Sequence, residues 1–378
     1  MSNTATYVEA LDAFPGQASD AALLDEDAED LERGLDAWSR RHGSRPTLLI
    51  PDDRALAHPA ERFACADVRQ VPRLHPLDDL SALRSWLDAT RDARLVRASD
   101  VAAHGKELRG GAATDRWVSV VGAVRSPRTW RVPIGTAVDQ LVRLSGGSTR
   151  EDAVVFRTRP LGSVRRASSV RSDDAVFVVM PGDAPLAVND SLSWDLAVRR
   201  IVAGCSRCSR CDDVCPAQPH VGARELADAL RWGGAGGGPA PRSSIAACIG
   251  CRACEVACPS GLPIGRVAQA VAGRVRASRD VAESTITRFT PRAAFARRVG
   301  VERDAIERAD ARSHVSRVRF VLGGGAASQL EPLVRSGARV WRGEAVAHGP
   351  GTRARIVAPF TGVVRVRETS LTIRREDE

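Results

Sequence analysis

Two closely spaced runs of cysteine constrain what this chain can fold into more than any other feature. The first lies in GCSRCSRCDDVCPAQPH (204–220) and the second in CIGCRACEVACPSGLPIG (248–265). Both runs have the spacing C-x2-C-x2-C-x3-C-P. Three cysteines at this spacing on a tight loop present thiolates to three corners of an iron–sulfur cubane, and the fourth ligand comes from elsewhere. The spacing therefore predicts a metal-binding domain.

The doubled motif also predicts which cysteines share a cluster. In two-cluster ferredoxins the last cysteine of each run ligates the cluster of the other run. We therefore expect two [4Fe-4S] clusters with crossed ligands. Cluster 1 takes Cys205, Cys208, Cys211 and Cys258. Cluster 2 takes Cys248, Cys251, Cys254 and Cys215.

Zinc is the alternative metal, because it also favours C-x2-C pairs. It needs only two such pairs per tetrahedral site, and it gives no reason for a third interlocked pair followed by x3-C-P in both runs. A disulfide scaffold is the other alternative, which the large size of the chain disfavours. Two clusters in one module, without the pattern of a substrate pocket, indicate electron conduction.

Arginines lie between the cluster ligands. Arg207, Arg210 and Arg252 would raise the reduction potential if they stabilised the more negative reduced cluster. The alternative is that they are exposed and screened by solvent. The sequence leaves both possibilities open.

The composition bears on partners and location. The formal net charge is +9, but 54 of the 55 basic residues are arginines that are scattered rather than clustered, so we expect no nucleic-acid partner. No run approaches the roughly 18 to 20 apolar residues that span a bilayer. We therefore expect no membrane span and a cytoplasmic protein.

The pattern of elements predicts a multidomain α+β protein. Residues 1–112 predict a reduced α/β region, in which Tyr7, Val8, Leu11 and Phe14 have helical spacing and Thr47–Pro51 is a buried strand. Further helices are expected over residues 24–38 and 78–92, followed by a strand in ARLVRA. An alternative role for the first helix is amphipathic docking.

The remaining segments divide into four parts. Residues 113–188 predict a β-β-α unit with alternating apolar residues, extended by two further strands. Residues 189–280 form a helical two-cluster domain, with a flexible connector at 233–241, and residues 281–316 predict a helical linker with a helix from Arg288 to about Ala309. Residues 317–378 alternate short apolar strands with Gly and Pro turns, which is typical of a small all-β domain.

The order of these motifs resembles one known family. VSVVGAVRSPRTWRVPIGTAVDQLVRLSGG, then VFVVMPGDAPL, then the doubled cysteine motif are similar to the family of the C subunit of the Rnf electron-transport complex and the cobalamin reductase of propanediol-utilising microcompartments. The resemblance implies that 113–188 is a soluble ligand-binding β-grasp (SLBB) domain. It also implies redox-protein partners and a bacterial microcompartment as one location.

The C-terminal segment adds to the resemblance. Val334, Gly337, Val340 and Gly343, followed by APFTGVV, resemble a barrel-sandwich hybrid domain at 317–378. A biotin or lipoyl carrier with this fold uses a lysine, and the only lysine of this chain is Lys106. We therefore expect a docking module rather than a covalent carrier.

The N-terminal region departs from the family pattern. The family opens with a flavin- and NADH-binding α/β domain that has a glycine-rich G-A-G-G-A-G-F-P-T signature, whereas this chain offers LDAFPGQASDAAL. An FMN phosphate needs close backbone approach, which glycines provide. The resemblance thus implies FMN, while the missing loop argues against it and indicates a degenerate flavin domain.

These features predict an electron-transfer protein between a flavin- or NADH-linked donor and an acceptor such as a corrinoid or another redox protein, with a bacterial microcompartment as one location. One alternative is an FMN-dependent NADH:cob(III)alamin reductase in its own right. The other is a scaffold that keeps its clusters for folding or for docking to a compartment shell. No catalytic residue is expected, because the chemistry would belong to the cofactors.

Overall fold

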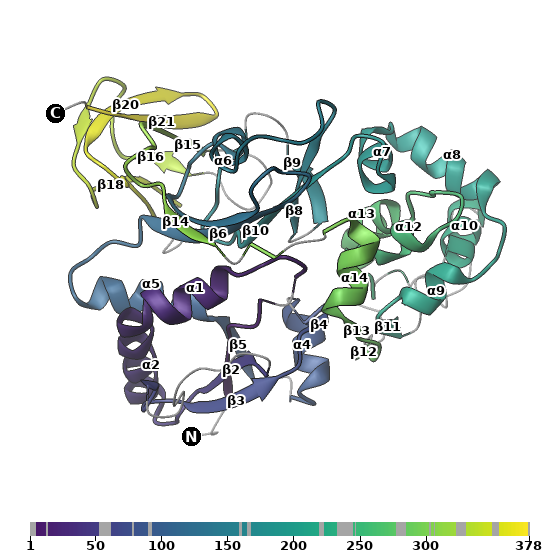
Figure 1. The fold of residues 1–378 in the computed structure, drawn as a ribbon, viewed down its shortest axis with the longest axis horizontal. Helices are drawn as coiled ribbons and strands as arrows, with labels where there is room; N and C mark the ends of the chain where they lie inside the picture. The colour runs from purple at the N-terminus through teal and green to yellow at the C-terminus, as the bar shows by residue number, and fades with distance from the viewer. Residues whose placement is uncertain are drawn as a thin grey trace.

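The computed structural model confirms a mixed α/β multidomain protein (Figure 1). It describes residues 5–12, 14–52, 62–77, 79–89, 93–158, 161–164, 168–218, 223–232, 245, 247–276, 285–301, 304–305, 307–322, 330–349 and 355–376. The connector expected at 233–241 lies outside these residues. No helix among them is long and apolar enough to cross a membrane.

The N-terminal region is built on a four-stranded sheet of order β3-β2-β1-β5, in which every pair is parallel. Helices α1, α2 and α5 lie on one side of it (Figure 1). The strands are β1 (Thr6–Glu9), β2 (Thr47–Pro51), β3 (Asp67–Val71) and β5 (Arg94–Arg97). The helices of this region are α1 (Ser19–Glu26), α2 (Ala28–His42), α4 (Leu80–Trp86) and α5 (Ala98–Leu108).

The helix predicted from the spacing of Tyr7, Val8, Leu11 and Phe14 is wrong. Tyr7 and Val8 belong to β1, which pairs with strands on both sides. Leu11 and Phe14 follow the strand and enter two different apolar cores. Four buried residues thus imitate a helical period, because a central parallel strand is buried on both faces and does not alternate. The alternative docking role depended on this helix and is therefore also wrong.

The single helix expected over 24–38 is two helices that meet at Asp27. Helix α2 packs against α5, a helix that the sequence did not predict, and glycines allow the close crossing. A Cβ at Gly105 would lie 1.8 Å from the backbone oxygen of Asp30, and one at Gly34 would lie 2.1 Å from that of Val101. Small residues at this crossing let two backbones touch.

The second sheet has six strands in the order β14-β7-β6-β10-β8-β9. Its β6-β7-α6 portion matches the predicted β-β-α unit. The strands are β6 (Asp115–Gly122), β7 (Arg128–Pro133), β8 (Val154–Thr158), β9 (Leu161–Val164), β10 (Val176–Met180) and β14 (Arg308–Asp310), and the helix is α6 (Val138–Leu144).

The helical linker expected at 281–316 is wrong over much of its length. Helix α14 covers only Arg292–Val299 and ends at Gly300, which has a left-handed conformation (φ 71°). Strand β14 then joins the six-stranded sheet, β13 (Thr290–Pro291) pairs with β4 (Leu74–His75), and β12 (Thr285–Ile286) pairs with β11 (Ala217–Gln218). This segment therefore pairs with strands of three regions: the cysteine-bearing region, the N-terminal region and the six-stranded sheet.

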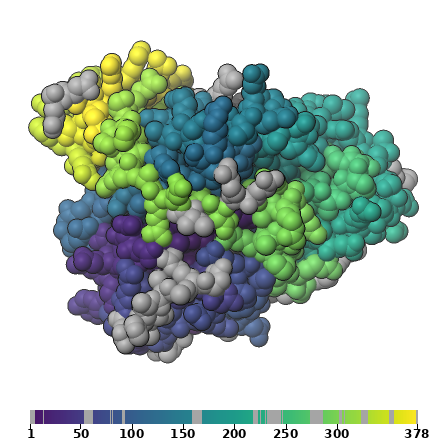
Figure 2. Space-filling view, viewed as in Figure 1, coloured from purple at the N-terminus to yellow at the C-terminus, as the bar shows by residue number. Residues whose placement is uncertain are grey.

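The cysteine-bearing region is helical, as predicted, and forms one end of the molecule (Figures 1 and 2). Its helices share an aliphatic core that includes Ile201, Leu226 and Val267. They are α7 (Pro185–Ser191), α8 (Trp194–Gly204), α9 (Arg210–Val214), α10 (Ala223–Trp232), α12 (Ala253–Ala257) and α13 (Ile264–Arg276).

The C-terminal residues form two small sheets around one apolar cluster. The first has the order β15-β21-β20-β17 and the second β16-β18-β19. Their strands are β15 (Arg317–Val321), β16 (Glu331–Pro332), β17 (Arg339–Val340), β18 (Ala345–His348), β19 (Arg355–Val357), β20 (Gly362–Arg367) and β21 (Ser370–Arg375).

Candidate metal centre

The two cysteine loops have the same backbone conformation. Arg207 (φ 57°) and Ser209 (φ 60°) occupy the left-handed region in the first loop, and Gly250 (φ 76°) and Arg252 (φ 55°) occupy it at the equivalent positions of the second. Successive left-handed and right-handed residues turn backbone N–H groups inward and create the anion-binding nests found at many iron–sulfur sites. Three of these four residues are not glycine, so the rest of the structure holds them in an uncommon conformation.

Each loop leads directly into a short helix. Ser209 is the N-cap of α9 and Arg252 is the N-cap of α12. The fourth cysteine of each run, Cys215 or Cys258, is the C-cap of that helix and is extended. Helices α9 and α12 contact each other. Each fourth cysteine is therefore carried away from its own loop and toward the other one.

The structure brings together the two predicted sets of four cysteines. Cys205, Cys208, Cys211 and Cys258 line one pocket, with Ala223 and Leu262 in its wall. In the other set, burial raises the pKa of Cys254 well above its ordinary value, and the charges of Glu255, Cys251, Cys248 and Cys215 raise it further. Cys258 thus lies with the first loop and Cys215 with the second. The ligand roles themselves remain predictions.

Backbone donors accompany these sulfurs. The N–H of Ala223 donates to Cys211 Sγ at 3.3 Å. Backbone N–H groups, with that of Arg210 first, lower the pKa of Cys208. Donors of this kind favour the thiolate, which is the form that binds metal.

A single tetrahedral ion fits these loops poorly. At a Zn–S distance of about 2.3 Å, four sulfurs converge to within roughly 4 Å of one another. No three His, Cys, Asp or Glu side chains among the described residues are grouped so as to hold one metal ion. A cubane places its ligands on separate irons and so needs a wider arrangement. Eight thiolates in two runs of this spacing fit two such clusters.

The second loop is locked by a buried ion pair that the sequence did not reveal. Arg252 is 2% exposed, and its Nε and one Nη donate to the two carboxylate oxygens of Glu255 at 2.9 and 2.8 Å. Glu255 is fully buried and also accepts from Asn189 Nδ2 at 2.8 Å and from the N–H of Arg266 at 2.7 Å. The Arg252 guanidinium further contacts Asp190 at 3.3 Å.

The interloop arginines are therefore not equivalent. Arg252 is buried and engaged, whereas Arg207 and Arg210 are exposed. The sequence treated the three alike, because residue type alone does not tell which loop the rest of the chain will cover.

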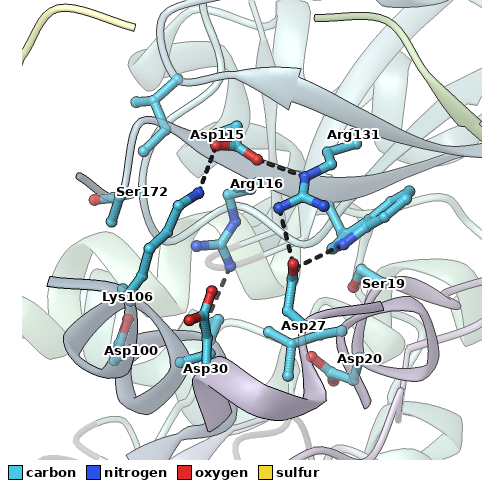
Figure 3. A pocket seen from close by; sticks show the side chains of 17 residues that line it. Ser19, Asp20, Asp27, Asp30, Asp100, Lys106, Asp115, Arg116, Arg131 and Ser172 are labelled. Carbon is cyan, nitrogen blue, oxygen red and sulfur yellow. Dashed lines mark hydrogen bonds and ion pairs between the residues drawn. The ribbon is translucent and has the colours of Figure 1, made fainter. Parts of the chain in front are cut away.

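A second cluster of charges lies where the N-terminal helices meet the six-stranded sheet (Figure 3). Asp115 accepts from Lys106 Nζ at 2.9 Å and from Arg131 Nε at 2.5 Å. Arg131 also donates to Asp27 at 2.8 Å, and Trp117 Nε1 donates to the same carboxylate at 3.0 Å. These groups satisfy one another across a domain interface, so the pocket they line is a junction between domains.

The SLBB domain family matches residues 117–166, and the 4Fe-4S dicluster domain family matches residues 204–263. The cobalamin reductase PduS of Salmonella typhimurium (strain LT2) is 32% identical over 123 residues, which are 31% of this chain and 26% of that protein. Over these segments the chain resembles the RnfC/PduS family. The predicted SLBB and iron–sulfur domains are confirmed.

Solved structures similar to this RnfC/PduS-like chain include two of NAD+-reducing [NiFe]-hydrogenase. The H2-reduced form is 15% identical with a TM-score of 0.43, over 72% of this chain and 56% of that one. The air-oxidised form is 16% identical with a TM-score of 0.44, over 79% and 62%. The RnfC/PduS-like chain therefore spans less than two thirds of each of these relatives.

The β1–α1 loop is the place to ask whether this chain could bind the phosphate of FMN. It lies at the end of a parallel sheet where nucleotides bind in open α/β folds. In this RnfC/PduS-like chain the N-terminus of α1 is filled by a side chain. Asp12 Oδ1 and Oδ2 accept from the N–H groups of Asp20 and Ala21, both at 2.8 Å. Asp20 in turn accepts from Gln17 Nε2 at 3.0 Å and from the N–H of Asp12 at 3.1 Å.

The Asp12 carboxylate accepts from the N–H groups of α1 to which a phosphate would otherwise bind. Burial, and then the nearby charge of Asp20, raise the pKa of Asp12 to about 7, because two acidic groups share a small space. Gly16, which could have allowed close approach, faces Val121 and Val301, and a Cβ there would lie within 2.9 Å of both. The residues of this loop do not fit an FMN phosphate.

Proposed function

We propose that this chain is an electron conduit with two [4Fe-4S] clusters between a flavin- or NADH-linked donor protein and an acceptor that is a corrinoid or another redox protein. The proposal is supported by two observations: Cys258 lines a pocket with the first three cysteines of the first run, and Cys215 is among the charges that act on Cys254 of the second run. When bound, each cluster supplies one-electron chemistry, and no covalent bond forms or breaks in the protein.

The chain's own groups hold and tune the clusters. The left-handed residues of both loops direct backbone N–H groups toward the sulfurs. Ala223 donates to Cys211, and the Arg252–Glu255 pair fixes the second loop against α7. Hydrogen bonds to sulfur and the exposure of each cluster set its reduction potential.

The filled β1–α1 loop supports a conduit without its own flavin. The donor is then a separate protein, and this chain does not oxidise NADH directly. Iron, sulfide and flavin analysis of anaerobically purified protein tests this, with an expectation of about eight irons per chain and no flavin. Fewer than two irons, together with stoichiometric zinc, would overturn the conduit.

Cysteine-to-serine variants test the crossed ligands. If Cys258 ligates cluster 1, then Cys258→Ser and Cys205→Ser will perturb the same electron paramagnetic resonance signal of the reduced protein. Cys215→Ser and Cys248→Ser will perturb the other signal. Cys65→Ser, outside both runs, serves as the control and should leave both signals intact. If Cys258→Ser and Cys248→Ser perturb one common signal, each run holds its own cluster and the crossing is refuted.

A corrinoid acceptor is favoured by one observation, the 32% identity to a protein named cobalamin reductase. It is tested by adding cob(III)alamin to the chemically reduced chain and following reoxidation of the clusters. Reoxidation that keeps pace with cobalamin reduction supports it, and a rate equal to that of the buffer control excludes it. Residence in a bacterial microcompartment rests on the same relative, and we propose it only together with the corrinoid acceptor.

A further inference from the structure

We infer that the first cysteine loop is the port at which a separate redox protein, acidic around its cofactor, exchanges electrons with this chain. The inference rests on the proposed conduit. Its starting point is exposure: all five residues from Ser206 to Arg210 are exposed, including Cys208, a predicted ligand of cluster 1. A cluster held here would lie at the molecular surface.

The equivalent part of the second loop is covered. Gly250, Arg252 and Ala253 are buried, and Cys251 is half-buried. Gln269 of α13 closes over Gly250, and the backbone oxygen of Leu186 in α7 accepts from Arg252 at 3.3 Å. Two loops with one backbone conformation thus differ in access, so an external protein can approach cluster 1 but not the second loop.

The exposed loop carries two cations, Arg207 and Arg210. No carboxylate of the described residues forms an ion pair with Arg207 or Arg210. Arg224 is also exposed and lines the same pocket. Among the described side chains, the acidic residues that follow this loop on α9 are Asp212, which faces Cys211 Sγ at 3.7 Å, and the exposed Asp213. The outward charge is positive, which favours an acidic partner.

Apolar side chains continue this surface along the helix that leads into Cys205. Trp194 and Leu196 of α8 are 40% and 47% exposed. Exposed Trp and Arg are the residue types that contribute most to binding at protein interfaces. Helices α8 and α10 lie at the end of the molecule away from the C-terminal sheets (Figures 1 and 2).

The test compares two reductants of the cluster-loaded full chain. Flavodoxin hydroquinone serves as an acidic protein probe, and photoreduced deazaflavin serves as a small neutral one. Stopped-flow absorbance gives the rate of cluster reduction at low and at high ionic strength. The variant is Arg207→Glu/Arg210→Glu, and the matched control is Arg317→Glu/Arg319→Glu on β15, where both arginines are exposed.

At low salt the loop variant should be reduced by flavodoxin at least about tenfold more slowly, with the salt dependence lost, because electrostatic steering is removed. Its reduction by deazaflavin should stay within about twofold of the parent chain, because the substitutions change the side chains and keep the backbone N–H groups of the loop. Both rates of the control should also stay within about twofold. Trp194→Ala should slow the reduction of the clusters by flavodoxin and leave their reduction by deazaflavin unchanged. Equal flavodoxin rates in the loop variant and the control would overturn the port. Clusters that deazaflavin cannot reduce in the unmodified chain would instead overturn the conduit.

Discussion

Arg252 shows what a single residue contributes to the metal centre. It occupies a left-handed backbone position, is buried, and is neutralised by a two-point contact with Glu255. A buried charge is tolerated only when it is paired, and removing one partner of such a pair is costly. The second loop therefore depends on a side chain that is not one of the predicted cluster ligands.

We expect Glu255→Gln to lower the free energy of unfolding by about 3 to 5 kcal/mol, because it leaves the buried guanidinium without its main carboxylate. Anaerobic urea unfolding followed by circular dichroism measures this. Asp190→Asn is the matched control, since Asp190 is partly exposed and makes one 3.3 Å contact with the same guanidinium. A loss of about 1 kcal/mol or less is expected for it. Equal losses in the two variants would contradict the role given to Glu255.

At this scale the sequence predicted the eight cysteines, because their spacing is local and chemically specific. It did not predict the Arg252–Glu255 pair, whose burial depends on contacts from α7 and α13. It also missed that the Asp12 carboxylate accepts from N–H groups in the first turn of α1. Asp12 lies outside the N-cap position, which is Ala18, so it gives no local capping signal. The missing glycines of the loop were noticed, but not the side chain that replaced the phosphate.

The cysteine loops are the elements on which the site depends. Gly250 combines a positive φ of 76° with close contact, because a Cβ there would lie 2.5 Å from Gln269 Nε2. Gly261 has a positive φ of 55°, but a Cβ added there would meet nothing within 4 Å. The two glycines therefore separate the effect of crowding from that of backbone conformation.

Gly250→Ala should reduce the occupancy of cluster 2, because an alanine is strained at a φ of 76° within the predicted ligand loop and the Gln269 amide must also move away. Gly261→Ala should cost only about 1 kcal/mol and leave both clusters in place. Iron content and the resonance signals of the reduced protein after reconstitution provide the measurement. Full occupancy of both clusters in Gly250→Ala would show that the loop tolerates the displacement.

Elements whose apolar residues repeat at regular spacing were predicted well. Elements without such a repeat were not. The β6-β7-α6 unit alternates in its strands and was placed correctly. Strand β1 is short and buried on both faces, so its apolar residues also fitted a helix. Helix α14 is shorter than expected because Gly300 ends it, and β14 has only three residues, too few for a pattern to reveal.

For the whole molecule, the charge network around Asp115 connects the N-terminal region to the six-stranded sheet. Burial alone would raise the pKa of Asp115, but Arg131 and Lys106 outweigh it and lower the pKa to about 2. Because this pKa is depressed on folding, the stabilisation is present above about pH 4 and is lost as the pH falls from 4 toward 2.

Asp115→Asn should therefore lower the free energy of unfolding at pH 7 by about 2 kcal/mol and weaken the pH dependence below pH 4. Iron-free protein suits the acid series, because acid dissolves the clusters, and urea unfolding gives the free energy. Glu307→Gln is the control, since Glu307 pairs with Arg128 while 73% exposed and should change stability by less than about 1 kcal/mol. A pH profile unchanged by Asp115→Asn would refute the assignment.

Strand β14 has a consequence for how this protein is made. Its partner β7 ends at Pro133, and β14 begins at Arg308, so the ribosome delivers the two about 170 residues apart. At roughly 5 to 20 residues per second, the edge of β7 stays open for on the order of 10 to 35 s. Both cysteine runs emerge within that interval. A nascent chain thus exposes the unpaired edge of β7, which is prone to aggregation. During the same interval its cysteines have not yet bound iron.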